Sequence, residues 1–217
     1  MKEQDKGLYK HIDILTERYP ALRYAEKTIW EAYLVMKECF EKDGKLLVAG
    51  NGGSAADAEH ITGELMKRFK TPRPISKELS DKLMKIDGDI GRRLSQNLER
   101  SLMTIPLTAH EALTTAYIND ADGYGVFAQQ LFGYGRKGDV FLAISTSGNS
   151  SNILNAAVLA RALDIKVIAL TGESGGKLLD HSDVCVRVPE KETYMVQELH
   201  LPVYHTWCLM LEEHFFV

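Results

Sequence analysis

Two kinds of hydrophobic pattern follow each other along the chain, and the change falls near residue 43. Before that point, apolar residues recur at spacings of three and four, which places them along one side of a helix. Pro20 falls between two such stretches, so we expect consecutive helices within residues 1–43. The stripes consist of Leu8, Ile12, Leu15 and Tyr19, followed by Leu22, Ala25, Ile29, Tyr33, Met36 and Phe40.

Short runs of branched apolar residues replace the helical stripes after residue 43. They cover residues 45–50, 103–108, 139–145, 166–172 and 183–188. Most of these runs are apolar at nearly every position, which is typical of strands buried on both faces of a parallel sheet. Each run is therefore predicted to be a buried strand.

Helical patterns lie between the predicted strands. One covers residues 151–163, and a last helix is predicted from about residue 193 to residue 216. Strands that alternate with helices form right-handed βαβ units, so the pattern predicts a doubly wound α/β sandwich. In such a sheet, ligands bind beyond the carboxyl ends of the strands.

One segment, residues 70–103, interrupts this alternation. It is highly charged, yet its apolar residues recur at spacings of three and four, which predicts an amphipathic helix or a hairpin broken at Asp87 and Gly88. We expect it to pack on its own subunit or to form a subunit contact, and a lid is the alternative. The apolar positions are Ile75, Leu79, Leu83, Ile86, Ile90, Leu94, Leu98 and Leu102.

Composition narrows the classes of function. Of the 217 residues, 45% are hydrophobic and 26% are charged, as in a globular domain that buries a core. The net charge is −4 without a polybasic block, which argues against nucleic-acid binding. The N-terminus lacks a signal-peptide core, and no apolar run is long enough to span a membrane. Cys39, Cys185 and Cys208 are widely spaced, so we expect reduced thiols in a cytoplasmic protein.

Two loops at predicted strand ends are rich in glycine and hydroxyl groups. Residues 50–54 read GNGGS, and residues 145–150 read STSGNS. Glycine lets the backbone approach a ligand closely, and the free N–H groups at a helix start point toward an anion. For either loop alone, turns and helix caps are the better explanation. Because both loops follow strands and neither has a nucleotide-binding spacing, the pair favours a site for a sugar phosphate.

Two polar pairs form a second group of candidates. His60 and Glu64 are four residues apart and share one face of a predicted helix. Gln197 and His205 lie on the predicted C-terminal helix, with His200 between them. From the residues alone, a surface hydrogen bond and a buried core histidine are simpler explanations than a metal site.

Four stretches together resemble one known family. They read GNGGSAADAEHITGELMKRF, AISTSGNSSNI, ALTGESGG and VQELHLPVYH. In their order and spacing they are similar to the phosphoheptose isomerases of the sugar isomerase (SIS) superfamily, over all of the chain except about residues 75–101. The resemblance implies one SIS domain over residues 1–217. Its implied fold is a flavodoxin-like doubly wound sandwich with a mostly parallel five-stranded sheet, N-terminal helices at 1–43 and a helical insertion at 75–101.

The resemblance also implies an activity and its residues. Members interconvert sedoheptulose 7-phosphate and D-glycero-D-manno-heptose 7-phosphate through an enediol, assisted by one zinc ion per site, in homotetramers with sites near subunit interfaces. Glu64 and His205 match the acid/base pair. The zinc ligands correspond to His60, Glu64, Gln197 and His205. The positions that hold the sugar phosphate correspond to Asn51, Gly52, Gly53, Ser54, Arg68, Asn119, Asp120, Ser145, Thr146, Ser147, Ser150 and Gln197.

The sequence departs from the family pattern at several positions. About 12 Å of helix axis separates Gln197 from His205, and Pro202 between them could bend the helix to help or to misplace His205. Tyr194 stands where some members carry an aspartate that contacts the substrate. Another phosphosugar isomerase, or a SIS module that binds a sugar phosphate without catalysis, therefore remains an alternative to the heptose enzyme.

Overall fold

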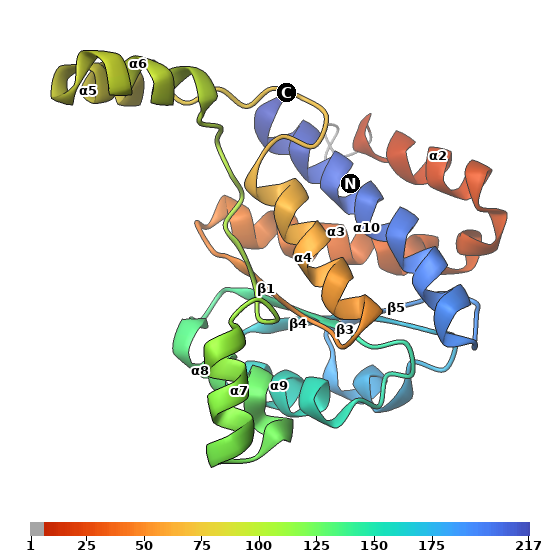
Figure 1. The fold of residues 1–217 in the computed structure, drawn as a ribbon. Helices are drawn as coiled ribbons and strands as arrows, with labels where there is room; N and C mark the ends of the chain where they lie inside the picture. The colour runs from red at the N-terminus through yellow and green to blue at the C-terminus, as the bar shows by residue number, and fades with distance from the viewer. Residues whose placement is uncertain (1–6) are drawn as a thin grey trace.

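The computed structural model describes residues 7–217, and its centre is a five-stranded sheet (Figure 1). All neighbouring strands are parallel, and each lies within one of the apolar runs, so the predicted strands are confirmed. The start of the predicted N-terminal region, residues 1–6, lies outside the described residues. The strands are β1 (Leu46–Ala49), β2 (Thr104–Pro106), β3 (Val140–Ile144), β4 (Lys166–Thr171) and β5 (Val184–Arg187).

The strand order is β2-β1-β3-β4-β5, which is the flavodoxin-like order that the sequence resemblance implied. The chain passes from β1 outward to β2 and then returns to β3 on the other side of β1. Leu47 of β1 accordingly pairs with Ile105 on one side and with Phe141 on the other. A crevice for ligands is expected at this reversal, beyond the carboxyl ends of β1 and β3.

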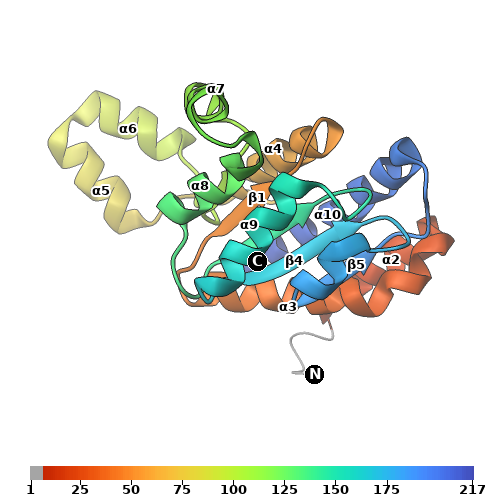
Figure 2. The ribbon, with the colours of Figure 1, turned by 90° about the horizontal axis from the view of Figure 1, so that it is seen from below.

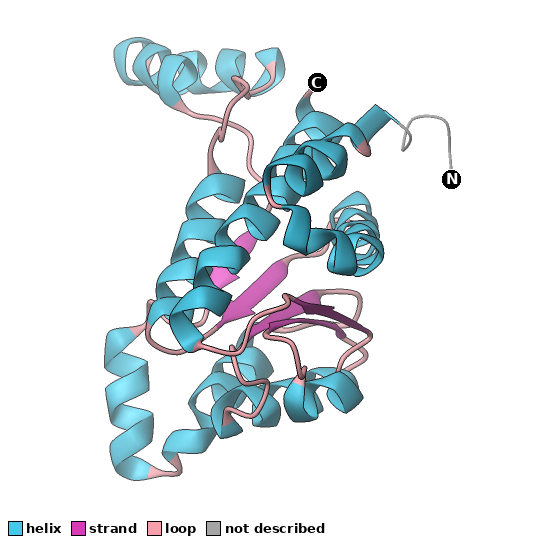
Figure 3. Cartoon of the chain, turned by 90° about the vertical axis from the view of Figure 1, so that its right-hand side faces the viewer, coloured by secondary structure: helices cyan, strands magenta, loops and turns pink. Residues whose placement is uncertain are grey.

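Helices cover both faces of the sheet (Figure 3). One layer contains α2 (Lys10–Arg18), the 3-10 helix η1 (Pro20–Ala25), α3 (Glu26–Glu41), α4 (Gly53–Met66) and α10 (Thr193–Phe216). The other layer contains α7 (Glu111–Asp120), α8 (Val126–Tyr134) and α9 (Ser151–Ala162).

The alternation of side chains along β1 produces two separate cores. Leu46 and Val48 pack into the core beneath α3, α4 and α10, whereas Leu47 and Ala49 pack into the core beneath α8 and α9. All four side chains are fully buried, as the period of two along a strand requires when both faces are covered. The uniform hydrophobicity of this strand in the sequence therefore has a direct structural cause.

Helix α10 runs beside α4 and carries the C-terminal part of the candidate site (Figure 1). It spans the predicted residues and stays one continuous helix through Pro202. The indole of Trp207 donates a hydrogen bond of 2.9 Å to the carbonyl of Ile29, which fixes α10 against α3. None of the helices within residues 7–217 combines the length and hydrophobicity needed to cross a membrane.

The insertion is a helical hairpin that projects from the body (Figures 1 and 2). Its helices, α5 (Lys77–Ile86) and α6 (Gly88–Asn97), are separated at Asp87, whose side chain caps α6. The two helices pack chiefly on each other, beyond the C-terminal end of α4 and thus far from its glycine loop. Several large apolar side chains of the hairpin are exposed, namely Leu79, Met84, Ile86, Ile90 and Leu98.

Candidate active site

The glycine loop after β1 turns directly into α4. Gly52 has a φ of +55°, a conformation that glycine adopts without strain, and the helix begins at Gly53. A Cβ atom on Gly53 would lie 2.5 Å from the side-chain amide nitrogen of Gln197, so the start of α4 lies directly against this side chain of α10. The loop is therefore shaped by its contact with α10 as well as by its own turn.

The second loop, between β3 and α9, is closed by its own hydroxyl groups and by a neighbouring turn. The hydroxyl groups of Ser145 and Ser150 lie 3.0 Å apart. Gly148 has a φ of +67°, and a Cβ atom there would lie 2.0 Å from the carbonyl oxygen of Gly175. The motif ALTGESGG thus provides a glycine turn that packs against the STSGNS loop, and a Cβ atom on Gly176 would lie 2.4 Å from the carbonyl oxygen of Ser147.

The two loops meet at the predicted crevice. The side-chain amides of Asn51 and Asn152 exchange two hydrogen bonds, of 2.9 and 2.8 Å, and so join the start of α4 to the start of α9. A cavity of about 410 Å³ opens beside this pair. Its lining consists of Asn51, Asp122, Gly123, Tyr124, Ser150, Ser151 and Asn152.

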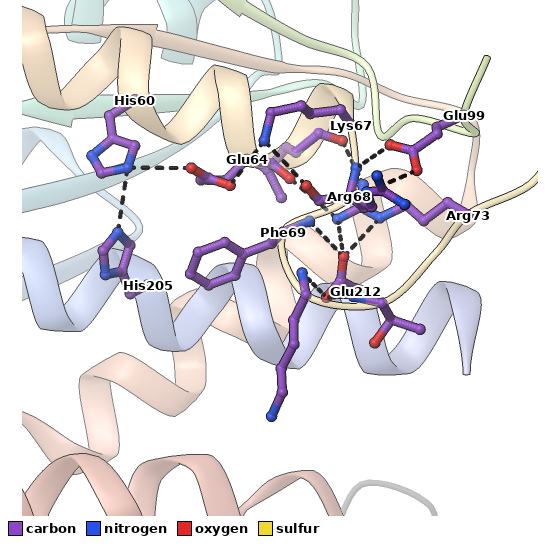
Figure 4. Close-up of polar contacts among 12 residues, drawn as sticks. His60, Glu64, Lys67, Arg68, Phe69, Arg73, Glu99, His205 and Glu212 are labelled. Atoms are coloured by element: carbon purple, nitrogen blue, oxygen red, sulfur yellow. Dashed lines mark hydrogen bonds and ion pairs between the residues drawn. The ribbon is translucent and has the colours of Figure 1, made fainter. Parts of the chain in front are cut away.

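Three of the four predicted metal ligands lie together farther along α4 and α10 (Figure 4). Nε2 of His60 is 3.3 Å from a carboxylate oxygen of Glu64 and 3.5 Å from Nε2 of His205. Burial lowers the pKa of His205, and the nearby His60 lowers it further. Glu64 is mostly buried, and Lys67 lies 3.6 Å from its other oxygen.

Gln197 lies apart from this group. Its amide packs against Gly53, seven residues before His60, which corresponds to about 10 Å along α4. Helix α10 continues through Pro202 as one helix, in which eight residues, or about 12 Å of axis, separate Gln197 from His205. Within residues 7–217, no three His, Cys, Asp or Glu side chains are arranged as a ready metal site.

The chemistry of the clustered donors nevertheless fits a zinc ion. Two ligands at about 2.1 Å from a tetrahedral zinc ion are about 3.4 Å apart, close to the two separations measured from His60. Imidazole nitrogen and carboxylate oxygen are both ordinary zinc ligands. If the protein binds the zinc ion that the family resemblance implies, the nearest ligands available to it here are His60, Glu64 and His205.

A buried hydroxyl group contacts the other ring nitrogen of His60, Nδ1. Tyr204 lies with its oxygen 3.0 Å from Nδ1 of His60 and 3.1 Å from a carboxylate oxygen of Asp57. Burial raises the pKa of Tyr204, and the Asp57 carboxylate raises it further, so the hydroxyl stays protonated. Burial also raises the pKa of Asp57, and the hydrogen bond from Tyr204 opposes that shift.

Known proteins share both the sequence and the fold. The SIS domain profile matches residues 15–102 and 94–172. The phosphoheptose isomerase of Aneurinibacillus thermoaerophilus is 38% identical over 179 residues, which cover 82% of this chain and 77% of that protein. The phosphoheptose isomerase of a Nitratiruptor species is 34% identical over 211 residues, which cover 97% of each. The chain belongs to the phosphoheptose isomerase family.

Solved structures of phosphoheptose isomerases also resemble this chain. The GmhA protein of Neisseria gonorrhoeae superposes with a TM-score of 0.71 at 33% identity, over 93% of this chain and 96% of that one. The Francisella tularensis protein gives 0.74 at 31% identity, over 98% of this chain and 100% of that one. The chain is therefore an isomerase with the SIS fold, as its motifs indicated.

Other predicted residues of the isomerase lie at the margins of the described site. The guanidinium of Arg68 faces Glu99, with Nε 3.4 Å from the carboxylate, at the base of the hairpin. Asn119 donates a hydrogen bond of 2.8 Å to Asp120 on the exposed end of α7. Neither Asn119 nor Asp120 lines the cavity beside Asn51, whose wall on that side comes from residues 122–124.

A buried ion pair at the end of α4 was not predicted from the sequence. Arg73 and Glu212 are 0% and 2% exposed and lie 2.9 Å apart (Figure 4). Arg73 donates to the carbonyls of Glu64 and Leu65, which are acceptors that the helix itself leaves unpaired. Glu212 accepts hydrogen bonds from three successive backbone N–H groups, and these bonds help to hold its pKa below the usual range.

These contacts fix the end of the helix that carries Glu64. The pair was not predicted because the sequence alone does not show whether a given arginine or glutamate is buried or exposed. Sequence reasoning also missed Asn152, although this residue lies two positions after the STSGNS loop, and Tyr204, which directly precedes His205. Asn152 and Tyr204 could have been found from their positions in the sequence, because each lies close to a motif residue.

Proposed function

We propose that the protein is an aldose–ketose isomerase that interconverts sedoheptulose 7-phosphate and D-glycero-D-manno-heptose 7-phosphate. The observation that carries this proposal is the alignment of two sites along one pair of helices. The anion-type loops lie at the start of α4, and the acid/base pair of Glu64 and His205 lies between α4 and α10 farther along. The phosphoheptose isomerases named above support the choice of substrate.

The spacing of these two sites suits a long sugar phosphate. His60 is about 10 Å from the first residue of α4 along the helix axis, and Glu64 is one turn farther. A phosphate held by the loops would therefore leave its reacting carbons several bonds away, as in a seven-carbon chain. Binding energy from the remote phosphate would position the reacting end.

The reaction requires two proton transfers on neighbouring carbons. Starting from the ketose, Glu64 takes a proton from carbon 1, and an enediol forms. His205 then delivers a proton to carbon 2, while the hydroxyl proton passes from oxygen 1 to oxygen 2, which leaves the aldose. A zinc ion held by His60, Glu64 and His205 in the resting site would supply a Lewis acid that polarises the carbonyl group. Ligation by Glu64 and His205 would be looser during turnover, because a group bound to the ion cannot accept or donate a proton at the same atom.

Contacts around the acid and the base also support the proposed reaction. Burial of Glu64 and the cap that Arg73 provides keep the carboxylate in one position relative to His205. Hydroxyl and backbone N–H groups of the STSGNS loop bind phosphate without a fixed positive charge, which allows release after turnover.

Turnover in heavy water tests this proposal directly. Purified protein supplied with zinc is expected to convert sedoheptulose 7-phosphate and to place deuterium on the carbon that His205 protonates. Glu64→Gln should lower turnover by at least about 1000-fold because the amide cannot accept the proton, while sugar-phosphate binding measured by calorimetry is largely retained. Near-normal turnover in Glu64→Gln would contradict the role given to this residue.

The same assay distinguishes the heptose substrate from shorter sugars. A pentose phosphate and a hexose phosphate serve as comparison substrates under identical conditions. Exchange with either of these, but not with the heptose, would assign the protein to another phosphosugar isomerase. Binding of all three without exchange would identify a non-catalytic sugar-phosphate module instead.

A further inference from the structure

Tyr204 joins the two helices of the site at one buried point. Its hydroxyl contacts Oδ1 of Asp57 at 3.1 Å and Nδ1 of His60 at 3.0 Å. Asp57 and His60 are one helical turn apart on α4, whereas Tyr204 lies on α10 beside His205. The tyrosine is 1% exposed, so water does not replace either contact.

The three groups have complementary roles in hydrogen bonding. An ionised carboxylate only accepts, and a tyrosine hydroxyl has a single proton to donate. If that proton goes to Asp57, the hydroxyl oxygen offers a lone pair to His60, which must then carry its own proton on Nδ1. The lone pair of the other ring nitrogen, Nε2, is then on the side of Glu64 and His205, where a bound zinc ion would accept it.

The Asp57 carboxylate is partly deprived of hydrogen-bond partners. Its other oxygen, Oδ2, is buried and has no hydrogen-bond partner within residues 7–217. A carboxylate in such surroundings loses hydration that its single hydrogen bond only partly replaces, so its presence costs stability and indicates a role beyond packing. The hydroxyl of Tyr204 is the contact through which this charge acts on His60.

We propose that Asp57 and Tyr204 are positioning residues that hold His60 in the tautomer protonated on Nδ1, with the Nε2 lone pair directed at Glu64 and His205. Partners of this kind orient the imidazole ligands of metal ions, and their removal weakens metal binding. The sequence carries no motif for this arrangement, because Asp57 and Tyr204 are far apart in the chain.

Nuclear magnetic resonance of isotope-labelled histidine tests the tautomer without substrate or metal, in a Glu64→Gln background that removes the carboxylate competing for a proton on Nε2. The ring-nitrogen shifts of His60, assigned with His60→Gln, are expected to show a proton on Nδ1 in this background. In Tyr204→Phe, which keeps the ring and loses only the hydroxyl, the Nε2-protonated form should rise. Asp57→Leu should shift the same equilibrium, whereas Asp57→Asn, which keeps an oxygen acceptor, should preserve the Nδ1 form.

A matched control is available at Tyr9. Its hydroxyl also donates to a carboxylate, that of Glu26, at 2.5 Å, but far from His60 in the sequence and on other helices. Tyr9→Phe should therefore leave the His60 spectrum unchanged. An unaltered His60 tautomer in folded Tyr204→Phe, with a normal melting temperature, would overturn the proposal.

Zinc affinity gives a second readout, which rests on the proposed function. Competition with a chelator should show that Tyr204→Phe binds zinc about 10- to 100-fold more weakly than Tyr9→Phe. Equal zinc affinities would overturn the role of Asp57 and Tyr204 in metal binding. Failure of the sugar assay would not affect either measurement, so the two proposals can fail separately.

Discussion

Gly148 makes the closest backbone approach in the STSGNS loop. Its φ of +67° and the 2.0 Å gap between a built Cβ and the Gly175 carbonyl leave no room for a side chain. At the scale of single residues, the shape of the crevice thus depends on the absence of a side chain at Gly148 as much as on the polar groups of the loop. His200, fully buried on α10, shows the opposite case of an ionisable ring enclosed by the core.

Alanine at position 148 is expected to distort the loop. Gly148→Ala should weaken the binding of a sugar phosphate at least about tenfold, because left-handed backbone and contact with Gly175 together cost more than about 1.4 kcal/mol. Calorimetry measures the binding. Gly133→Ala on α8, where a Cβ meets no atom within 4 Å, serves as the control and should bind normally.

His200 predicts a loss of stability in acid. Burial lowers its pKa from 6.5 to about 4, so between these values the unfolded chain binds more protons than the folded one. The free energy of unfolding should therefore fall as the pH decreases from about 6.5 to about 4, by about 3 kcal/mol in total. Urea unfolding across this range, in the parent and in His200→Leu, measures the difference; equal pH slopes would contradict it.

The candidate site could be predicted from the sequence only where residues lie within one motif. The two loops and the pair of His60 and Glu64 are local, and the structure brings them to the expected end and face of α4. The position of Gln197 depends on how two helices are aligned, which local spacing does not reveal. Asp57 and Tyr204 likewise meet only through the packing of α4 on α10.

At the scale of elements, α4 is held at both of its ends. Its start packs on Gln197, and its end is capped by Arg73, which is paired with Glu212 on the last turns of α10. The strands were predictable because their short runs are almost uniformly apolar, and the final helix was predictable because its helical pattern extends over more than 20 residues. The ion pair was not, since a charged residue in a sequence is ordinarily exposed.

Removal of one partner of this pair is expected to be severe. Glu212→Ala leaves the buried guanidinium of Arg73 unpaired and should lower the free energy of unfolding by about 3–5 kcal/mol. Chemical unfolding measures the change. Glu78→Ala, which breaks the exposed pair with Lys82 on the hairpin, should lower it by less than about 1 kcal/mol. Similar losses in both variants would contradict the importance of burial.

At the scale of the whole molecule, the hairpin is the least integrated part. The chain enters and leaves it side by side, at the antiparallel bridge between Pro74 and Glu99. Its apolar face includes Ile86, which is 84% exposed. Since exposed apolar patches of this kind commonly mark contacts, we expect the hairpin to join subunits in the homotetramer that the family resemblance implies.

Deletion of the hairpin tests this expectation. Replacing residues 76–98 by a short glycine-serine linker should leave the sheet and the melting temperature of the body largely unchanged, because the bridge at Pro74 and Glu99 keeps the chain ends together. The mass measured by light scattering should fall below that of four chains. A parent protein that is not tetrameric, or a deletion that keeps four chains, would contradict the predicted contact.

The division of the sheet into two cores has a practical consequence for protein engineering. Leu131 and Ile165 lie in the core beneath α8 and α9, while the acid/base pair lies on the opposite layer. Random libraries restricted to such positions could raise heat resistance while leaving the alignment of α4 and α10 untouched. Selection for new sugars would then start from a more tolerant scaffold.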